Sequence, residues 1–369
     1  MQRRYKLFLL LLLASFNSVW GQSTYRKTYD AYVSGNEIGS EKSMSKLVDE
    51  QTSRYFIIIS FFINSNNVMY EKTKDVKYLQ SNEKVLKNFR TKKGTFKAKF
   101  NKNEQNYELN DKESSLLEGY LYRYMAQYYY ILSGLDSKTL SRNGLNKDFG
   151  YVEDRFMYWY KASYNSTKDD SFLHGIRVHM GAQWATCALY LRKLTAKSEN
   201  RDIYGKFLKR YDENLRANLH KKTVNKKTVY YWNATWDSDF TNSLKKRRKK
   251  HNENSEIQDT AHGSHVVEYI ITAYELSYGQ WSKKDIEYLA NTLYELIYDK
   301  KNEVFSDLIN GKNSSLKDIR DTGKKQTDGW MKLIKYDTRL KPVYEAYLKK
   351  NKKFLERTNY YNQYLSNLL

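Results

Sequence analysis

The stretch that decides the fold runs from Gln258 to Tyr274, QDTAHGSHVVEYIITAY, and it carries the chain's closely spaced histidine pair. Asp259 precedes the apolar run in the position of a helix N-cap, where a carboxylate accepts the free backbone N–H groups of the first turn. His262 and His265 then lie on nearly the same face of the helix that follows. The spacing predicts a buried helix with two imidazoles at its N-terminal end, although each histidine alone is also consistent with a purely structural role.

Composition and apolar spacing predict an all-α chain. The 369 residues include one proline and 16 glycines, too few for the turns that a sandwich or barrel of short strands needs. Apolar residues instead recur at helical spacing, and Ser282 with Asp285 forms the capping-box pattern that starts a helix. The ranges expected to be helical are 55–62 (where a strand is the alternative), 114–135, 154–164, 171–194, 202–218, 282–298 and, as the last helix, 342–353.

Three stretches depart from the helical pattern. Thr228 to Asp239, TVYYWNATWDSD, alternates in a way that predicts an extended segment or short hairpin. Thr327 to Leu333, TDGWMKL, is expected to be a turn that carries Trp330. The run from Lys245 to Asn254, KKRRKKHNEN, has no apolar residue and is expected to be a solvated loop without a catalytic group.

The first residues have the features of a secretory signal peptide. A positively charged start is followed by an apolar core at Leu7–Ala14 and small residues near Val19–Gly21. We therefore expect residues 1–21 to be removed and residues 22–369 to form a single domain, a monomer, in the periplasm or outside the cell. No cysteine follows that suits a lipoprotein anchor, and no later apolar run is long enough to span a membrane.

The charge of the chain favours an anionic polymer as its partner. The net charge is +22 at pH 7, and loss of three basic residues with the leader leaves +19. A positive field of this size raises the encounter rate with polyanions. We expect an acidic polysaccharide rather than nucleic acid, because no helix-turn-helix, zinc finger or aromatic sheet motif is present.

A second group of polar candidates lies in the range 171–194. Arg177, His179 and Trp184 follow one another within about two turns of the expected helix. A basic residue beside a histidine and a tryptophan suits binding of a sugar carboxylate, while a hydrogen-bonded histidine in the core is the alternative. Sugar-binding clefts use amphipathic aromatic rings, but many aromatic residues of this chain are also expected to pack between helices. The further candidate sugar contacts are Trp232, Asn233 and Trp236.

The order of these features resembles the C-terminal half of (α/α)-toroid polysaccharide lyases and related toroid enzymes. The aromatic segment Tyr230–Asn233 is followed by Gln258–His262, an apolar helix and the helix at 282–298, so that the resemblance covers about residues 170–335. The stretch Arg177–His179 is similar to the Asn-Asn-His helix of toroid alginate lyases but has neither asparagine. The resemblance implies an (α/α) toroid, an incomplete barrel of helical hairpins, acting on a uronate polymer such as alginate or glucuronan; we expect no cofactor and no metal.

Toroid lyases cleave uronate polymers by β-elimination, which requires three kinds of group. A base removes the proton at C5, an acid protonates the departing glycosidic oxygen, and a third group neutralises the uronate carboxylate. The resemblance implies His262 or His179 as the base and Tyr231 as the acid. Arg177 or His265 is the expected neutralising group.

Other functions are compatible with the same residues. A glycoside hydrolase on the same fold needs two facing carboxylates, for which Asp237, Glu256 and Asp259 are available, although Asp259 already serves as an N-cap. His262 and His265 are two potential metal ligands, but a zinc site usually takes three or four. A non-catalytic protein that binds acidic glycans would keep the aromatic residues and the charge.

Overall fold

The computed structural model describes residues 24–35, 39–50, 54–93, 108–110, 113–135, 142–238, 257–315, 320–326 and 328–369. The proposed leader at 1–21 and the basic run at 245–254 lie outside the described residues. Helices dominate the described part, so the predicted all-α class is confirmed. None of these helices is long and apolar enough to cross a membrane.

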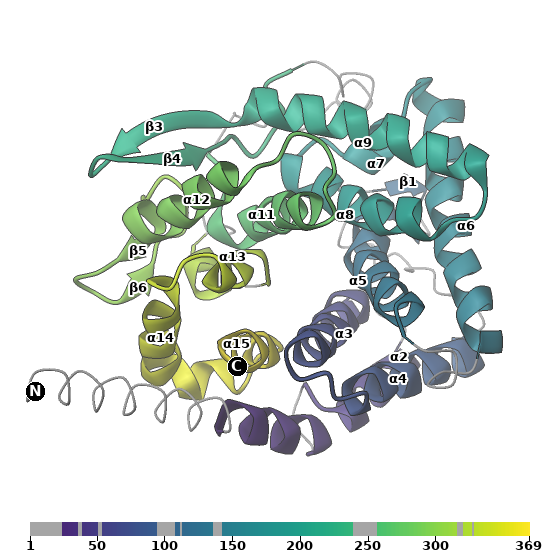
Figure 1. Ribbon diagram of the computed structural model, residues 1–369, viewed down its shortest axis with the longest axis horizontal. Helices are drawn as coiled ribbons and strands as arrows, with labels where there is room; N and C mark the ends of the chain where they lie inside the picture. The colour runs from purple at the N-terminus through teal and green to yellow at the C-terminus, as the bar shows by residue number, and fades with distance from the viewer. Residues whose placement is uncertain are drawn as a thin grey trace, which may run out of the picture.

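An inner set of helices closes into a ring (Figure 1). Each of these helices packs against the next, and the last packs against the first. The ring therefore joins segments from the two ends of the chain. In ring order the helices are α3 (Arg54–Thr73), α5 (Ser115–Ser133), α8 (Val178–Leu194), α11 (Thr260–Glu275), α13 (Asp328–Lys332) and α15 (Tyr360–Leu368).

A second set of helices lies around the outside of the ring (Figure 1). The chain alternates between the two sets, so that an outer helix connects most pairs of neighbouring inner helices. Because of this alternation, the inner helices all run in the same direction, from one end of the ring to the other. The outer helices are residues 24–34, α2 (Glu41–Glu50), α4 (Lys77–Lys93), α6 (Arg142–Thr167), α9 (Ser198–Asn218), α12 (Lys283–Asn291) and α14 (Leu340–Leu355).

Short two-stranded sheets interrupt the helices of the described part. The longest is an antiparallel hairpin of β3 (His220–Val224) and β4 (Lys227–Tyr231), in which His220 pairs with Tyr231. The predicted extended segment at 228–239 therefore corresponds to β4 and to the isolated β-bridges that follow it. The strand that pairs with β4 is β3, which precedes it in the chain. The remaining pairs are β1 (Glu108–Asn110) with β2 (Glu113–Ser114) and β5 (Tyr298–Asp299) with β6 (Val304–Phe305).

Local signals fix several helix boundaries as predicted. The Asp259 side chain accepts a hydrogen bond from the backbone N–H of His262, which confirms it as the N-cap of α11. Ser282 and Asp285 form a complete capping box at the start of α12. The single helix predicted at 171–194 is wrong, because Gly175 has a positive φ of 64° and divides it into α7 (Ser171–His174) and α8.

The C-terminal part departs most from the predictions. The expected turn at 327–333 is instead α13 followed by a 3-10 turn at Leu333–Lys335. The helix expected to be the last, 342–353, is α14, and the inner helix α15 follows it. Both α13 and α15 are short, and their helical form depends on packing inside the ring more than on their own length.

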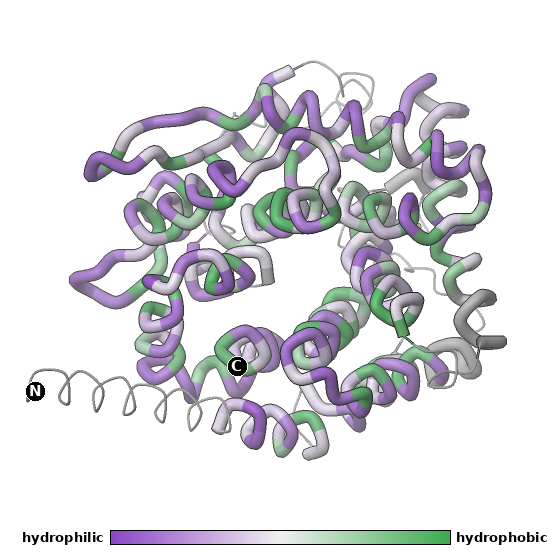
Figure 2. Tube along the Cα trace, in the orientation of Figure 1, coloured by the Kyte–Doolittle hydropathy of each residue, from purple (hydrophilic) through white to green (hydrophobic). Residues whose placement is uncertain are grey.

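Burial explains why the inner helices have weak amphipathic patterns. Figure 2 shows many apolar residues on α11 and α3 and many hydrophilic ones on the β3–β4 hairpin. One continuous apolar cluster extends from Tyr29 to Leu368 and includes residues from every inner helix. A helix that is covered on most sides carries apolar residues around most of its circumference. The polar residues that the inner helices do contain are consequently buried and must pair with one another.

We expect the contact between α13 and α11 to require glycine at position 329. A Cβ at Gly329 would collide with the backbone oxygen of Ser264 and lie 2.8 Å from the backbone nitrogen of Glu268. Gly329→Ala is therefore expected to lower the free energy of unfolding by about 3 kcal/mol or more, measured by urea denaturation. Gly150→Ala is the matched control, because a Cβ at Gly150 meets nothing within 4 Å and alanine favours a helix by up to ~1 kcal/mol. Equal midpoints for the two variants would contradict this view of the contact.

Candidate active site at one end of the ring

Three histidines and a tyrosine meet where α5, α8 and α11 begin. The rings of His179 and His262 stack with centroids 4.3 Å apart. His265 lies 6.4 Å from each of them, measured between ring centroids. The ring of Tyr120 packs edge-on against His265 at 4.9 Å. The histidine cluster, defined as His179, His262 and His265, therefore brings together residues from positions far apart in the chain.

His262 is the accessible member of the histidine cluster, and its orientation is fixed by Asp259. The His262 side chain is 41% exposed, and its Nδ1 lies 2.8 Å from the Asp259 carboxylate. Burial raises the pKa of Asp259, but the charge and hydrogen bonds of His262 outweigh this effect and hold that pKa well below its usual range. An ionised carboxylate accepts a hydrogen bond from Nδ1–H. The second nitrogen of His262, Nε2, is then the acceptor of the ring.

Gln258 links this pair to His179. The side-chain amide of Gln258 donates to Asp259 at 3.0 Å, so its oxygen is the atom that faces His179 Nδ1 at 3.4 Å. His179 therefore donates through Nδ1–H and keeps Nε2 as an acceptor. Burial, the neighbouring His262 and Arg177 lower the pKa of His179 well below its usual value, which keeps this ring neutral.

His265 is buried beneath the pair, and Arg123 fixes its tautomer. Arg123 Nη1 lies 3.0 Å from His265 Nδ1. A guanidinium can only donate, so Nδ1 accepts and the ring proton of His265 is on Nε2. Burial and the charge of Arg123 lower the pKa of His265 well below its usual value. The Nε2–H group consequently donates to the hydroxyl oxygen of Tyr120, 3.0 Å away.

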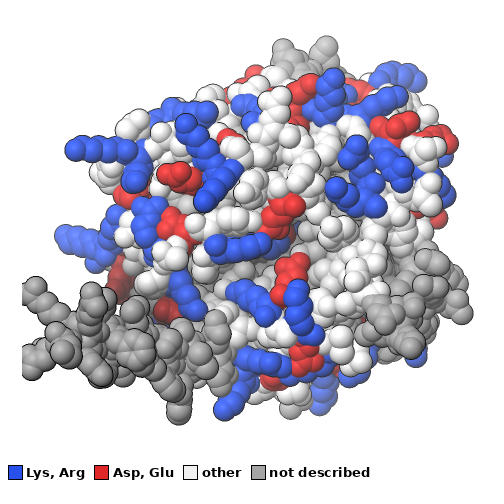
Figure 3. All heavy atoms as spheres, in the orientation of Figure 1, with Lys and Arg blue, Asp and Glu red and all other residues white. Residues whose placement is uncertain are grey.

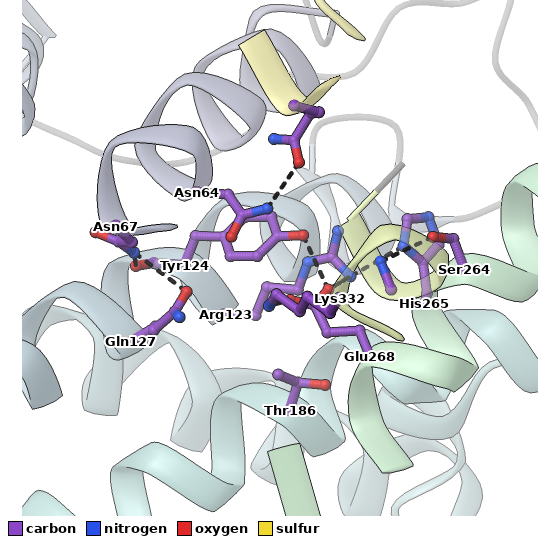
Figure 4. A network of polar contacts seen from close by, with 12 residues as sticks. Asn64, Asn67, Arg123, Tyr124, Gln127, Thr186, Ser264, His265, Glu268 and Lys332 are labelled. Atoms are coloured by element: carbon purple, nitrogen blue, oxygen red, sulfur yellow. Dashed lines mark hydrogen bonds and ion pairs between the residues drawn. The ribbon is translucent and has the colours of Figure 1, made fainter. Parts of the chain in front are cut away.

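A buried charge network supports the histidine cluster from inside the ring. Arg123 forms an ion pair with Glu268 at 3.0 Å, and both side chains are almost fully buried. Glu268 also accepts a hydrogen bond from Tyr124 at 2.9 Å and pairs with Lys332 of α13. Figure 4 shows these side chains converging from three inner helices. Two cations and a hydroxyl thus offset the loss of water around this buried carboxylate.

Further polar pairs continue across the ring toward α3 and α15. Asn67 donates to Gln127 of α5, and Asn64 donates to Gln363 of α15 (Figure 4). Gln127 in turn donates to Glu71 at 3.3 Å. The interior of the ring is therefore lined by paired polar groups along its length, from the histidine cluster toward the opposite end.

Arg177, Tyr231 and Asn233 occupy different positions relative to the cluster. Arg177 directly precedes α8 and is half-buried, and its charge reaches His179. The ring of Tyr231 lies on the β3–β4 hairpin against His220 at 5.2 Å. Asn233 donates to Asp237 at 2.8 Å. The structure thus brings Arg177 close to the histidine cluster, whereas Tyr231 contacts the hairpin. Asn233 forms a β-bridge with Ile257, which directly precedes Gln258, and its backbone oxygen accepts a hydrogen bond from Asn218 of α9.

The three tryptophans considered as sugar contacts are buried. Trp184 donates to the backbone oxygen of Ser115 at 2.9 Å, and Trp236 donates to that of Gly175 at 3.1 Å. Trp232 stacks on Trp330 with centroids 6.2 Å apart. Packing between helices accounts for these rings, and the function proposed below does not use them.

The sequence did not point to Arg123 or Glu268 as parts of a site. Spacing contained a partial signal, because Tyr120 and Arg123 are three residues apart, as are His265 and Glu268. Each pair therefore lies on one helix face. Nothing in the sequence indicated that these two faces meet.

The arrangement of these side chains does not resemble a metal centre. Within the described ranges, no three His, Cys, Asp or Glu side chains are grouped so that they could hold a metal ion. Nδ1 of His262 and Nδ1 of His265 are both engaged, by Asp259 and Arg123. The groups that can still react are an imidazole nitrogen and a phenol, which are typical of proton transfer.

Comparisons with known proteins add no relative. No protein-family model, curated protein or solved structure matches the chain. The fold and site define an all-α ring with a cluster of three histidines and a tyrosine at one end.

We expect the two neutral buried histidines to make stability depend on pH. His179 and His265 have pKa values well below the usual value, so the unfolded chain binds more protons than the folded one as the pH falls below about 6.5. The free energy of unfolding should fall below that pH, with a slope of up to about 1.4 kcal/mol per pH unit for each histidine. Urea denaturation between pH 7.5 and about 5 would measure this slope.

Substitutions separate this effect from other titrating groups. His265→Gln is expected to reduce the slope, whereas His220→Gln, at an exposed histidine of the hairpin, is expected to leave it unchanged. An unaltered slope in His265→Gln would show that this histidine is not held neutral.

Proposed function

We propose that this protein is a polysaccharide lyase that cleaves an acidic, uronate-containing polymer by β-elimination. The observation that carries the proposal is the Asp259–His262 pair, which makes His262 an oriented and accessible imidazole. His265 is near both His262 and Tyr120, with ring centroids 6.4 Å and 4.9 Å away. The closed ring of alternating inner and outer helices supports the resemblance to (α/α)-toroid lyases. The net charge of +22 supports an anionic polymer as the substrate, and Figure 3 shows many lysine and arginine side chains on the viewed face.

His262 has the properties of the base. Asp259 holds the proton of the ring on Nδ1, which leaves the Nε2 lone pair to accept the proton from C5 of the uronate. Asp259 also stabilises the imidazolium that forms, because its carboxylate is ionised. Partial exposure of His262 allows a polymer to reach it.

Tyr120 has the properties of the acid. As the C5 proton moves to His262, the electrons of that bond form the C4–C5 double bond and the bond from C4 to the glycosidic oxygen breaks. The oxygen takes the proton of Tyr120. The phenolate that results accepts a hydrogen bond from His265 Nε2–H and lies near the Arg123 guanidinium, 5.4 Å from the ring centre. This role was expected for Tyr231, and the proposal assigns it to Tyr120 because Tyr120 contacts the histidine cluster.

Arg177 is the proposed group that neutralises the uronate carboxylate. It lies two residues before His179 at the start of α8, and its charge acts on that histidine. A guanidinium binds a carboxylate with two parallel hydrogen bonds. Neutralisation lowers the cost of the charge that develops on the carboxylate when the C5 proton leaves.

Among the residues that the structure describes, the carboxylates at this site do not suit the glycoside hydrolase alternative; Glu256 lies outside the described residues. Asp259 is engaged by His262 and by the N-terminus of α11, and Glu268 is paired with Arg123 and Lys332. A hydrolase needs one carboxylic acid that stays protonated, which these partners disfavour. A protein that only binds acidic glycans has no need for the Asp259–His262 pair, so the activity assay also tests this alternative.

We expect incubation with uronate polymers to yield products that absorb in the ultraviolet, because elimination creates a double bond conjugated to the carboxylate. A panel that includes alginate and glucuronan would identify the polymer. His262→Gln and Tyr120→Phe are each expected to lower kcat by about 10²- to 10⁴-fold. His220→Gln, which changes a histidine of the hairpin, should retain activity.

The outcomes distinguish the alternatives. New reducing ends without ultraviolet absorption would indicate that the protein is a hydrolase and not a lyase. Binding of a polymer without any cleavage would indicate a glycan-binding protein. Full activity in both His262→Gln and Tyr120→Phe would place the reaction elsewhere on the molecule.

A further inference from the structure

A cavity of ≈ 330 Å³ opens at the end of the ring opposite the histidine cluster. It is lined by residues from the last turns of inner helices, including Lys72 of α3, Glu275 of α11 and Leu368 of α15. Along α11, His262 in the first turn is separated from Glu275 in the last turn by roughly 20 Å at the usual rise of an α-helix. This cavity is therefore distinct from the proposed active site.

One side of the cavity carries two ammonium groups without a carboxylate partner. Lys72 donates to the backbone oxygen of Asn367, and it makes no ion pair with any described residue. Lys341 makes neither a hydrogen bond nor an ion pair within the part of the chain that the structure describes. Although Lys72 reaches solvent through the cavity, the surrounding protein atoms and the charge of Lys341 lower its pKa to about 8. An anion placed between the two ammonium groups would offset their mutual repulsion.

The other cations that line the cavity are already neutralised. Lys332 pairs with Glu268, and Lys335 pairs with Glu275 at 2.7 Å. Glu71, which also lines the cavity, has its pKa raised by burial, and Gln127 donates to it. Lys72 and Lys341 are therefore the lysines of the cavity lining that make no ion pair with a described residue.

The rest of the lining is largely apolar. Hydrocarbon side chains from different inner helices contribute to it, and they suit a short alkyl chain more than a hydroxylated sugar, whose hydroxyl groups need polar partners. The volume lies at the lower end of the range for small-molecule sites, about 300–1,000 Å³, so a polysaccharide chain does not fit. The apolar lining residues are Val68, Met331, Ile334, Leu368 and Leu369.

We propose that this cavity binds a small amphiphilic anion, a carboxylate joined to a short hydrocarbon chain, with its carboxylate between Lys72 and Lys341. The alkyl chain lies against the apolar lining. This site does not depend on the function proposed for the histidine cluster, and its ligand is not the polymer.

Calorimetric titration of the full chain with octanoate tests the proposal. We expect one octanoate to bind per chain, and the double variant Lys72→Gln/Lys341→Gln to bind it roughly 10- to 100-fold more weakly, as expected for loss of charge-assisted hydrogen bonds. Affinity should also fall as the pH rises through about 8, because Lys72 loses its proton there. Acetate, which lacks the chain, and octanol, which lacks the charge, should both bind more weakly than octanoate.

Matched variants make the test specific. Lys349→Gln removes an exposed charge from the same helix as Lys341 and should keep the affinity of the unmodified chain. Lys341→Arg retains the charge and should keep most of the affinity. If the double variant does not fold, the single variant Lys341→Gln can be titrated with octanoate instead, because Lys341 has no partner among the described residues to lose. Absence of octanoate binding, unchanged affinity in the glutamine variants, or equal affinity for acetate would each overturn the proposal.

Discussion

The ion pair between Arg123 and Glu268 is the interaction on which the interior of the ring depends. Both groups are almost fully buried, and taking such charges out of water costs several kcal/mol for each ion. The cost is offset only if the partners hold their positions, and those partners come from α5, α11 and α13. Removing one member would leave an uncompensated charge inside the ring. The packing of these three inner helices therefore depends on keeping the buried charges paired.

Arg123 of this pair also affects the histidine cluster, because it fixes which atoms there donate hydrogen bonds and which accept them. Arg123 can only donate, so His265 must accept on Nδ1 and donate from Nε2 to Tyr120. At the rim, Asp259 can only accept while it is ionised, so His262 must donate from Nδ1. The two imidazoles thus have opposite tautomers. This difference explains how neighbouring histidines can support different proton-transfer roles in the proposed elimination.

The features that the sequence predicted correctly are those set by residues close together in the chain. The Asp259 cap, the Ser282 capping box and the helix at 114–135 follow from spacing alone, because the interacting groups are within one or two turns. The site depends on the contact between His265 and Tyr120, which are 145 positions apart, and no local pattern specifies it. α13 was missed for a related reason, since five residues containing a glycine form a helix only when packing on α11 supports them.

The alternation of inner and outer helices also accounts for the different chemistry at the two ends of the ring. Because the inner helices run in one direction, their N-termini meet at the histidine cluster and their C-termini meet at the cavity. The partial positive charge of helix N-termini favours the anionic groups of a uronate polymer, and the partial negative charge of C-termini favours lysines. Lys72 shows this directly, because it donates to the carbonyl of Asn367 in the last turn of α15. Lys341 lines the same cavity from the first turn of α14 and has no carboxylate partner among the described residues. The two proposed anion sites therefore depend on different groups, helix N-termini at one end of the ring and lysine side chains at the other.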